Sequence, residues 1–282
     1  MSTQSFSERL LGDRAGLGVP RRVVQFGSVL GFLVVWWALV RFGVLGFEYL
    51  ADPVETGTNM LAYLAGEPMA SGGTIYLHAA YSTFRVVFGV GIAAVLAVPL
   101  GLAIGTSQRF EDYTFPALEI LRPIPPVAWV PISVLLLPAL DLLGIQVSLA
   151  VLFVVFIGAF FPILINTVEG VRTIEDEYTR AAHSLGAEGL QVFRYVVFPA
   201  TLPSILTGIS ISIGLGWITV VAAEIIAGNY GLGYTIFQAY RLLQTDVVLV
   251  GMVVIGVLGY ASSALVNRYA ARRMPWSERE SR

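Results

Sequence analysis

The sequence contains neither cysteine nor lysine among its 282 residues. Without cysteine, the chain has no disulfide, no thiolate metal site and no cysteine nucleophile. Without lysine, it has neither a Schiff base nor the lysine of a nucleotide-binding P-loop, so it is not itself a Walker-type ATPase. The two histidines, His78 and His183, are far apart, and neither has a metal ligand at helical spacing. We therefore expect no catalytic centre, no metal and no cofactor.

Charged residues are scarce as well. They make up only 13% of the chain, whereas 56% of the residues are hydrophobic, and the mean hydropathy is +0.76. The net charge of −2 provides no basic surface for a nucleic acid. This composition excludes an ordinary soluble domain and is typical of a chain that crosses a membrane several times.

Six uncharged runs have the length of membrane spans. They predict an all-α polytopic membrane protein of six helices, with a transmembrane domain at 23–267 between polar tails at 1–22 and 268–282. No clear cleavage site follows the first run, so we expect a retained helix and not a signal peptide. A short amphipathic helix is expected at Pro53–Leu64. The six runs are Val23–Val40, Val86–Ser107, Pro123–Leu140, Leu142–Val168, Tyr195–Ala223 and Val247–Asn267.

The distribution of arginine predicts the orientation. With a cytoplasmic N-terminus, thirteen arginines fall in inside segments and two, Arg41 and Arg241, in outside segments. Both termini and the segment 169–198 are then expected in the cytoplasm. The thirteen are Arg9, Arg14, Arg21, Arg22, Arg109, Arg172, Arg180, Arg194, Arg268, Arg272, Arg273, Arg279 and Arg282.

The polar stretch from Thr173 to Pro203 separates two of these runs. Thr173 and Asp176 have the spacing of a capping box, which predicts the start of a short helix. Gly186 is placed to end that helix. A second short helix follows, with Leu190, Phe193 and Val197 on one face, and Pro199 and Pro203 are expected to bend the chain into the next span. One face of the first helix carries Tyr178, Ala181, Ala182 and Leu185. Periodicity alone leaves open a helix pair lying on the bilayer surface or one that docks a partner.

The third run is irregular. It reads P-I-P-P-V-A-W-V-P after Arg122, and five prolines within 16 residues exclude a straight helix. Broken backbone at membrane depth is tolerated where it lines a cavity or is covered by protein, and it often marks a substrate path in transporters. We therefore expect a path lined by Arg122, Pro123, Pro125, Pro126, Trp129 and Glu224.

Ionisable residues within spans are usually functional, although each one here also has a structural interpretation. Arg85 is expected near the outer interface, with its charge reaching toward water. Arg122 has Glu119 one turn before it, so the two side chains are also placed to pair. Glu224 is placed either to cap a helix end or to balance an arginine elsewhere in the bundle.

Small residues recur every four positions in two of the runs, which predicts closely packed helices. The first row is Gly89, Ala93, Ala97, Gly101 and Gly105, and the second is Ser204, Gly208, Ser212 and Gly216.

Residues 180–199 read R-A-A-x3-G-x9-V-x-F-P. This resembles the EAA loop of binding-protein-dependent ABC importer permeases, with Arg180 in place of the glutamate. The strings R-P-I-P-P-V-A-W-V-P and V-V-A-A-E-I-I-A-G, the latter at 220–228, resemble the sulfonate, taurine, nitrate and bicarbonate branch. The resemblance covers about Phe84 to Asn267.

The resemblance implies a type I permease fold in the plasma or inner membrane and a path for a small anion. It implies a homodimer, two separate ATPase subunits that hydrolyse ATP, and an extracytoplasmic binding protein. It also implies that the ATPase contacts Tyr178, Arg180, Ala181, Ala182, Leu185, Gly186 and Pro199. A secondary transporter, a membrane scaffold or sensor, and an importer of a thiamine-precursor pyrimidine remain alternatives.

Overall fold

The computed structural model describes residues 21–69, 71–142 and 145–273. Most of the predicted tails at 1–22 and 268–282 therefore lie outside the described residues. The chain divides into two compact units, Met1–Thr58 and Asn59–Arg282, which are described separately. The elements, in chain order, are α2 (Arg21–Arg41), η1 (Val44–Tyr49), α3 (Pro53–Leu64), α4 (Ile75–Thr106), α5 (Gln108–Leu121), η2 (Pro126–Trp129), α6 (Val130–Leu136), β1 (Ala139–Leu142), β2 (Ile145–Ser148), α7 (Leu149–Arg172), α8 (Asp176–Ser184), α9 (Leu190–Val192), the π-helical turn η3 (Phe193–Val197), α10 (Phe198–Ala227), α11 (Leu232–Arg241) and α12 (Thr245–Arg273).

The first unit contains α2, η1 and the beginning of α3. Most side chains of α2 are apolar and exposed, as expected for a helix whose surroundings are lipid. The helix confirms the first predicted span. Asp52 accepts hydrogen bonds from the backbone N–H groups of Val54 and Glu55, both at 2.8 Å, and so caps the start of α3. The bounds of α3 match the predicted short helix.

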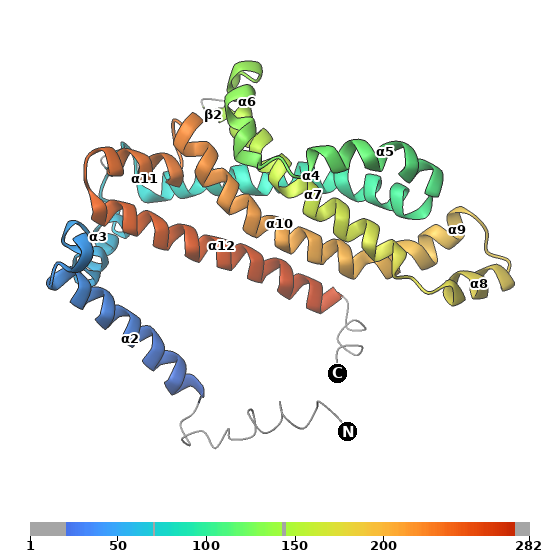
Figure 1. Ribbon diagram of the computed structural model, residues 1–282, viewed down its shortest axis with the longest axis horizontal. Helices are drawn as coiled ribbons and strands as arrows, with labels where there is room; N and C mark the ends of the chain where they lie inside the picture. Colours follow the sequence, from blue (N-terminus) through green and yellow to red (C-terminus); the bar gives the residue numbers. More distant parts are fainter. Residues whose placement is uncertain (1–20, 70, 143–144, 274–282) are drawn as a thin grey trace. The chain divides into compact units, whose positions relative to one another are not determined.

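The second unit is built around α7, which packs along both α4 and α10 (Figure 1). Val151, Val154 and Val155 of α7 are fully buried between these two neighbours. A smaller apolar cluster joins the start of α4 to α11 and α12, and Asn59 Nδ2 donates to Asp246 Oδ2 at 2.9 Å beside it. The core therefore lies along the length of α7.

Both predicted rows of small residues face α7. A Cβ added to Gly101 of α4 would lie 2.7 Å from Thr167 Cβ, and one added to Gly208 of α10 would lie 2.9 Å from Asn166 Cβ. In return, Gly158 and Gly170 of α7 leave room for side chains of α10. Ser212 Oγ also donates to the Ala159 carbonyl at 2.8 Å. Glycine thus permits the close approach of three helices.

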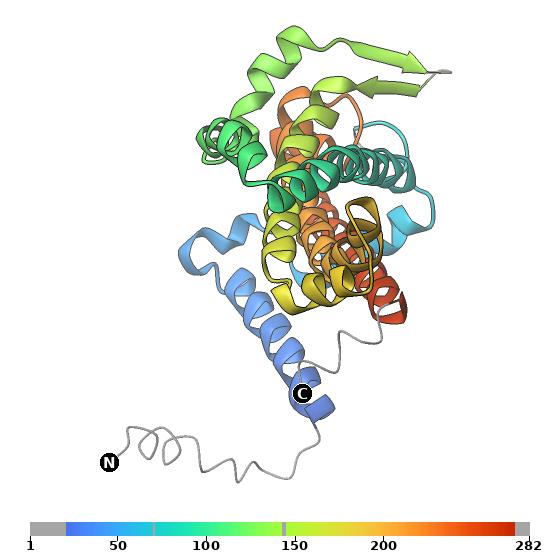
Figure 2. The ribbon, with the colours of Figure 1, turned by 90° about the vertical axis from the view of Figure 1, so that its right-hand side faces the viewer.

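The third and fourth predicted spans were wrong in their bounds. The run predicted at Pro123–Leu140 is the second half of a bent pair, in which α5 and the segment Pro126–Leu136 meet at 85°. The run predicted from Leu142 begins as a helix only at Leu149, because β1 and β2 pair antiparallel from Ala139↔Ser148 to Leu142↔Ile145. Figure 2 shows this hairpin and α6 to one side of α4, α7 and α10.

Among the described residues, five helices are long and apolar enough to cross a membrane, or six if the bent pair counts as one span. The fold is thus the predicted all-α membrane fold. The second span begins at Ile75, well before the predicted Val86, because polar residues in its first turns are buried in contacts with other helices.

Candidate functional site

The predicted first helix of the polar stretch is α8. It begins at Asp176, after Glu175 in extended conformation. Asp176 and Glu177 place negative charge in the first turn, where it interacts favourably with the helix dipole. The predicted capping box is wrong, because Thr173 still has helical angles at the end of α7. Its hydroxyl donates back to the Gly170 carbonyl at 3.1 Å and is not available to α8.

Gly186 ends α8, as the sequence predicts. Its φ of 82° lies in the left-handed region, which suits glycine. The Gly186 N–H donates to the His183 carbonyl at 2.9 Å, and the Ala187 N–H donates to the Ala182 carbonyl at 3.0 Å. These two bonds form a Schellman motif, which closes the helix and turns the chain toward α9.

The apolar face of α8 has little of this chain to pack against. Tyr178 is 61% exposed and Leu185 is 89% exposed, and Leu190 of α9 is 78% exposed. Arg180 is exposed and makes no ion pair among the described residues. Of the other predicted contact residues, Ala181 and Gly186 are exposed, whereas Ala182 and Pro199 are half-buried. In Figure 1, α8 and α9 lie at one end of α7 and α10.

The second predicted helix is continuous with the next span. The helical run from Leu190 to Ala227 has a π turn at Phe193–Val197, where the Phe198 N–H donates to the Phe193 carbonyl five residues back. Pro199 follows this π turn, inside the continuous helical run, where it donates no backbone hydrogen bond. The Thr201 hydroxyl donates to the Val197 carbonyl at 2.8 Å. The prolines are therefore absorbed within the helix and do not separate two elements.

The broken segment lies between α5 and α6. Arg122 directly follows α5, and Pro125 is in extended conformation before η2, so the break falls where the prolines predict it. Arg122 is exposed and, like Glu119, has no ion-pair partner among the described residues. The interpretation of these two as a pair is therefore wrong in this structure.

The remaining candidates in the broken segment differ in burial. Pro123 and Pro125 are exposed, whereas Pro126 and Trp129 are half-buried against α7. The Trp129 ring meets the Phe153 ring edge-on at 6.2 Å. Its Nε1 atom is buried and has no hydrogen-bond partner among the described residues, which leaves one donor unused at the break.

Glu224 lies elsewhere, in a buried ion pair with Arg85. Arg85 Nη1 is 2.7 Å from Glu224 Oε1, and these side chains are 2% and 0% exposed. Glu224 therefore balances an arginine across the bundle, as one sequence interpretation holds. The expectation that the charge of Arg85 reaches toward water is wrong, because the side chain is buried in the bundle and pairs with Glu224.

Five further hydrogen bonds hold the turn that follows α10. Arg85 Nη1 also donates to the Tyr230 carbonyl at 2.6 Å, and the Gly233 N–H donates to Glu224 Oε2 at 2.9 Å. Ser82 Oγ lies 2.9 Å from both carboxylate oxygens and accepts from the Leu232 N–H. We call this group of residues, together with His78, the clasp.

His78 extends the clasp toward the start of α4. Its Nδ1 accepts from the Gly231 N–H at 3.2 Å, so Nε2 carries the proton that is donated to the Gly72 carbonyl at 2.7 Å. Gly231 has a φ of 125°, and a Cβ there would overlap the Glu224 carboxylate. The turn thus needs glycine for both its angle and its space.

The clasp and α8 lie toward opposite ends of α10. Glu224 is separated from Phe198 by about 39 Å of helix at a rise of 1.5 Å per residue. That length exceeds the hydrocarbon thickness of a bilayer, about 30 Å. When α10 crosses a membrane, the clasp and α8 are therefore at opposite faces.

Residues 97–275 match the family of binding-protein-dependent transport system inner membrane components. The chain belongs to this family. The permease is 36% identical to a nitrate import permease of Leptolyngbya laminosa, in an alignment that covers 97% of this chain and 94% of the relative. It is 32% identical to the taurine transport system permease of Escherichia coli, in an alignment that covers 90% of this chain and 89% of the relative.

The fold agrees with this membership. A chain of a solved amino acid ABC transporter has a TM-score of 0.55 to the permease at 16% sequence identity. The superposition covers 79% of the permease and 99% of that chain. The permease is thus a multi-pass transport component with the type I permease fold, and its relatives are transport permeases and not enzymes.

Sequence reasoning found Arg85 and Glu224 but missed their connection. His78, Ser82 and Arg85 lie at i, i+4 and i+7, so they form a polar stripe on one face of an otherwise apolar helix. That stripe was the available signal, since buried charges in spans are normally paired.

The ion pair in the clasp predicts that replacing one partner is more harmful than replacing both. Arg85→Met leaves Glu224 as an unpaired buried charge and should lower the free energy of unfolding by about 3–5 kcal/mol. The double variant Arg85→Met/Glu224→Gln should recover most of that loss. Thermal unfolding of the purified protein in detergent checks both. Equal destabilisation by the single and the double variant would show that the ion pair is not what holds the turn.

Proposed function

We propose that the permease forms the membrane path of an ATP-driven importer for a small anion such as nitrate, bicarbonate or a sulfonate. The names of the relatives support this class of solute, since they include nitrate, bicarbonate, taurine and aliphatic sulfonate permeases. The solute would be delivered by an extracytoplasmic binding protein. ATP would be hydrolysed by two separate ATPase subunits, and two copies of the permease would enclose the path.

The unburied face of α8 is the observation that carries the proposal. Tyr178 and Leu185 form an apolar surface on a helix that a Schellman motif holds in a fixed direction. We propose that this face, together with Arg180, Ala181 and Ala182, contacts the ATPase, and that Gly186 and Pro199 set its angle to α10. The bias of arginine supports a cytoplasmic location for this loop and for both termini.

The path is proposed to run beside the broken segment. Arg122 is exposed, carries a permanent charge and presents a planar set of donors that suits carboxylate, nitrate and sulfonate oxygens. Pro123 and Pro125 leave neighbouring carbonyl groups without helical donors, and Trp129 adds an unused N–H. We propose that Pro126 and Trp129 line the path beside Arg122. Glu224 would act on the path through the clasp and not by contact with the anion.

Labelling of a single cysteine tests the position and the docking of α8 together. The chain has no cysteine of its own, so Leu185→Cys adds one reactive side chain at an 89% exposed position. We expect no reaction with an impermeant maleimide in intact cells, rapid reaction in inside-out vesicles, and at least 5-fold slower reaction once the ATPase is bound.

Glu55→Cys, at an exposed position on the predicted outer side, is the matched control and should react in intact cells. Labelling of Leu185→Cys from outside would overturn the orientation. Unchanged labelling in the presence of the ATPase would remove the docking face.

Gly186→Val tests whether the Schellman turn transmits the ATPase cycle. A β-branched residue at a φ of 82° is strained by about 1–3 kcal/mol, so the turn should open and the face of α8 should lose its direction. We expect normal insertion, with solute-stimulated ATP hydrolysis reduced at least 10-fold. Ser184→Val adds the same side chain at a helical position and should keep the activity. Wild-type stimulation in Gly186→Val would contradict the coupling role.

Arg122→Gln tests the anion path. Loss of a charged hydrogen bond, worth about 1.5–3 kcal/mol, should slow uptake of the anion about 10- to 150-fold while the complex still assembles. Arg109→Gln removes an exposed arginine of α5 far from the break and should have little effect. Uptake is measured with labelled solute in proteoliposomes. Recovery of uptake by an added Glu119→Gln would show that Arg122 serves a structural pair.

A further inference from the structure

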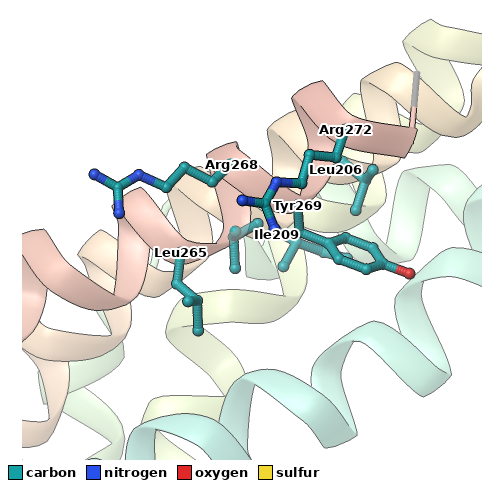
Figure 3. A pocket seen from close by; sticks show the side chains of 7 residues that line it. Leu206, Ile209, Leu265, Arg268, Tyr269 and Arg272 are labelled. Carbon is teal, nitrogen blue, oxygen red and sulfur yellow. The ribbon is translucent and has the colours of Figure 1, made fainter. Parts of the chain in front are cut away.

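A groove of about 580 Å³ lies between α10 and α12, near the carboxyl end of α12 (Figure 3). Leu206 and Ile209 of α10 form one side of it, and residues of α12 form the other. Ser210 Oγ donates to Asn267 Oδ1 at 2.8 Å, and Trp217 Nε1 donates to Ser262 Oγ at 3.0 Å, so polar contacts join the two helices beside the groove. The α12 side consists of Leu265, Val266, Arg268, Tyr269 and Arg272.

Two arginines, Arg268 and Arg272, lie at the edge of this apolar lining. Arg268 and Arg272 are one helical turn apart, so their like charges share one side of α12. Figure 3 shows the Arg272 side chain directed over the groove toward Tyr269, whereas Arg268 extends outward from it. Both arginines are exposed, and neither makes an ion pair among the described residues.

The two helices that line the groove offer no nearby counter-charge. Within the described residues α10 has one acidic residue, Glu224, which lies about 27 Å along the helix from Leu206 and is paired with Arg85. The acidic residue of α12, Asp246, is about 33 Å from Arg268 and accepts from Asn59. No carboxylate of these two helices therefore lies close enough to pair with the two arginines, which leaves both charges open to an anion from outside the helices.

We propose that this groove binds an anionic phospholipid. The phosphate would lie between Arg268 and Arg272, and an acyl chain would occupy the groove against Leu206, Ile209 and Leu265. Tyr269 would lie at the level of the headgroup, where aromatic residues with a polar end are favoured. A free phosphate would leave the apolar lining uncovered, and a neutral lipid would leave the arginines without a partner. In the proposed orientation the site faces the cytoplasmic leaflet, where anionic lipids attract arginine.

Native mass spectrometry of the purified full chain tests the site. The protein is incubated with equal amounts of phosphatidylglycerol and phosphatidylethanolamine, and the bound copies of each lipid are counted. Removing each arginine should weaken phosphatidylglycerol binding about 5-fold, so Arg268→Gln/Arg272→Gln should lose about 25-fold. Leu265→Trp, at a 71% exposed position, fills the groove without a change of charge and should weaken binding to a similar extent.

The control Arg109→Gln/Arg241→Gln removes the same charge from exposed positions outside the groove and should bind phosphatidylglycerol like the wild type. Equal loss in this control, or no loss in Leu265→Trp, would show diffuse attraction of anions and overturn the site. Competition by inorganic phosphate at equal concentration would also overturn it. So would a change from dimer to monomer in the arginine variant without lipid, since that result would assign the face to a second copy of the chain. Stronger lipid binding after replacement of Glu278 and Glu280 by Gln would identify these acidic residues as the native occupant.

Discussion

The ion pair between Arg85 and Glu224 is the interaction on which the second unit depends most directly. Removing two charges from water costs several kcal/mol for each, and only a complete set of partners offsets that cost. Here Ser82 and the N–H of Gly233 complete the carboxylate, and the carbonyl of Tyr230 receives the second bond of the guanidinium. These groups come from α4, the end of α10 and the turn before α11, so the complete set of contacts around the pair forms only when all three are in place.

The clasp also explains why α4 is longer than its apolar run. The first turns contain His78, Ser82 and Arg85, which would be expected in water if the helix stood alone. In the bundle they are almost fully buried, because the turn after α10 supplies the donors and acceptors they require. Residues that are distant in sequence therefore set the true start of this helix.

The sequence predicted best what neighbouring residues decide. Gly186 ends α8 because its own left-handed angle and two adjacent backbone bonds suffice, and the prolines after Arg122 break the chain by local chemistry. The bent pair with α5, the hairpin β1–β2 and the pairing of Arg85 depend on contacts between distant segments, which one sequence does not display. The prediction of a cap at Thr173 was wrong because the helical angles of α7 extend to this residue and its hydroxyl bonds back to Gly170. The proposed roles of the α8 face and of Arg122 depend on an ATPase and an anion that lie outside this chain, so its sequence does not determine them.

The glycine contacts along α7 have a mechanical consequence. Gly101 and Gly208 each admit a partner so closely that no Cβ fits, and Gly158 and Gly170 do the same in the opposite direction. Sliding α7 along its axis would carry Gly158 and Gly170 away from the α10 side chains that they admit, and larger side chains of α7 would meet these contacts instead. The close contacts at these glycines therefore favour one axial register of α4, α7 and α10 and oppose sliding between them.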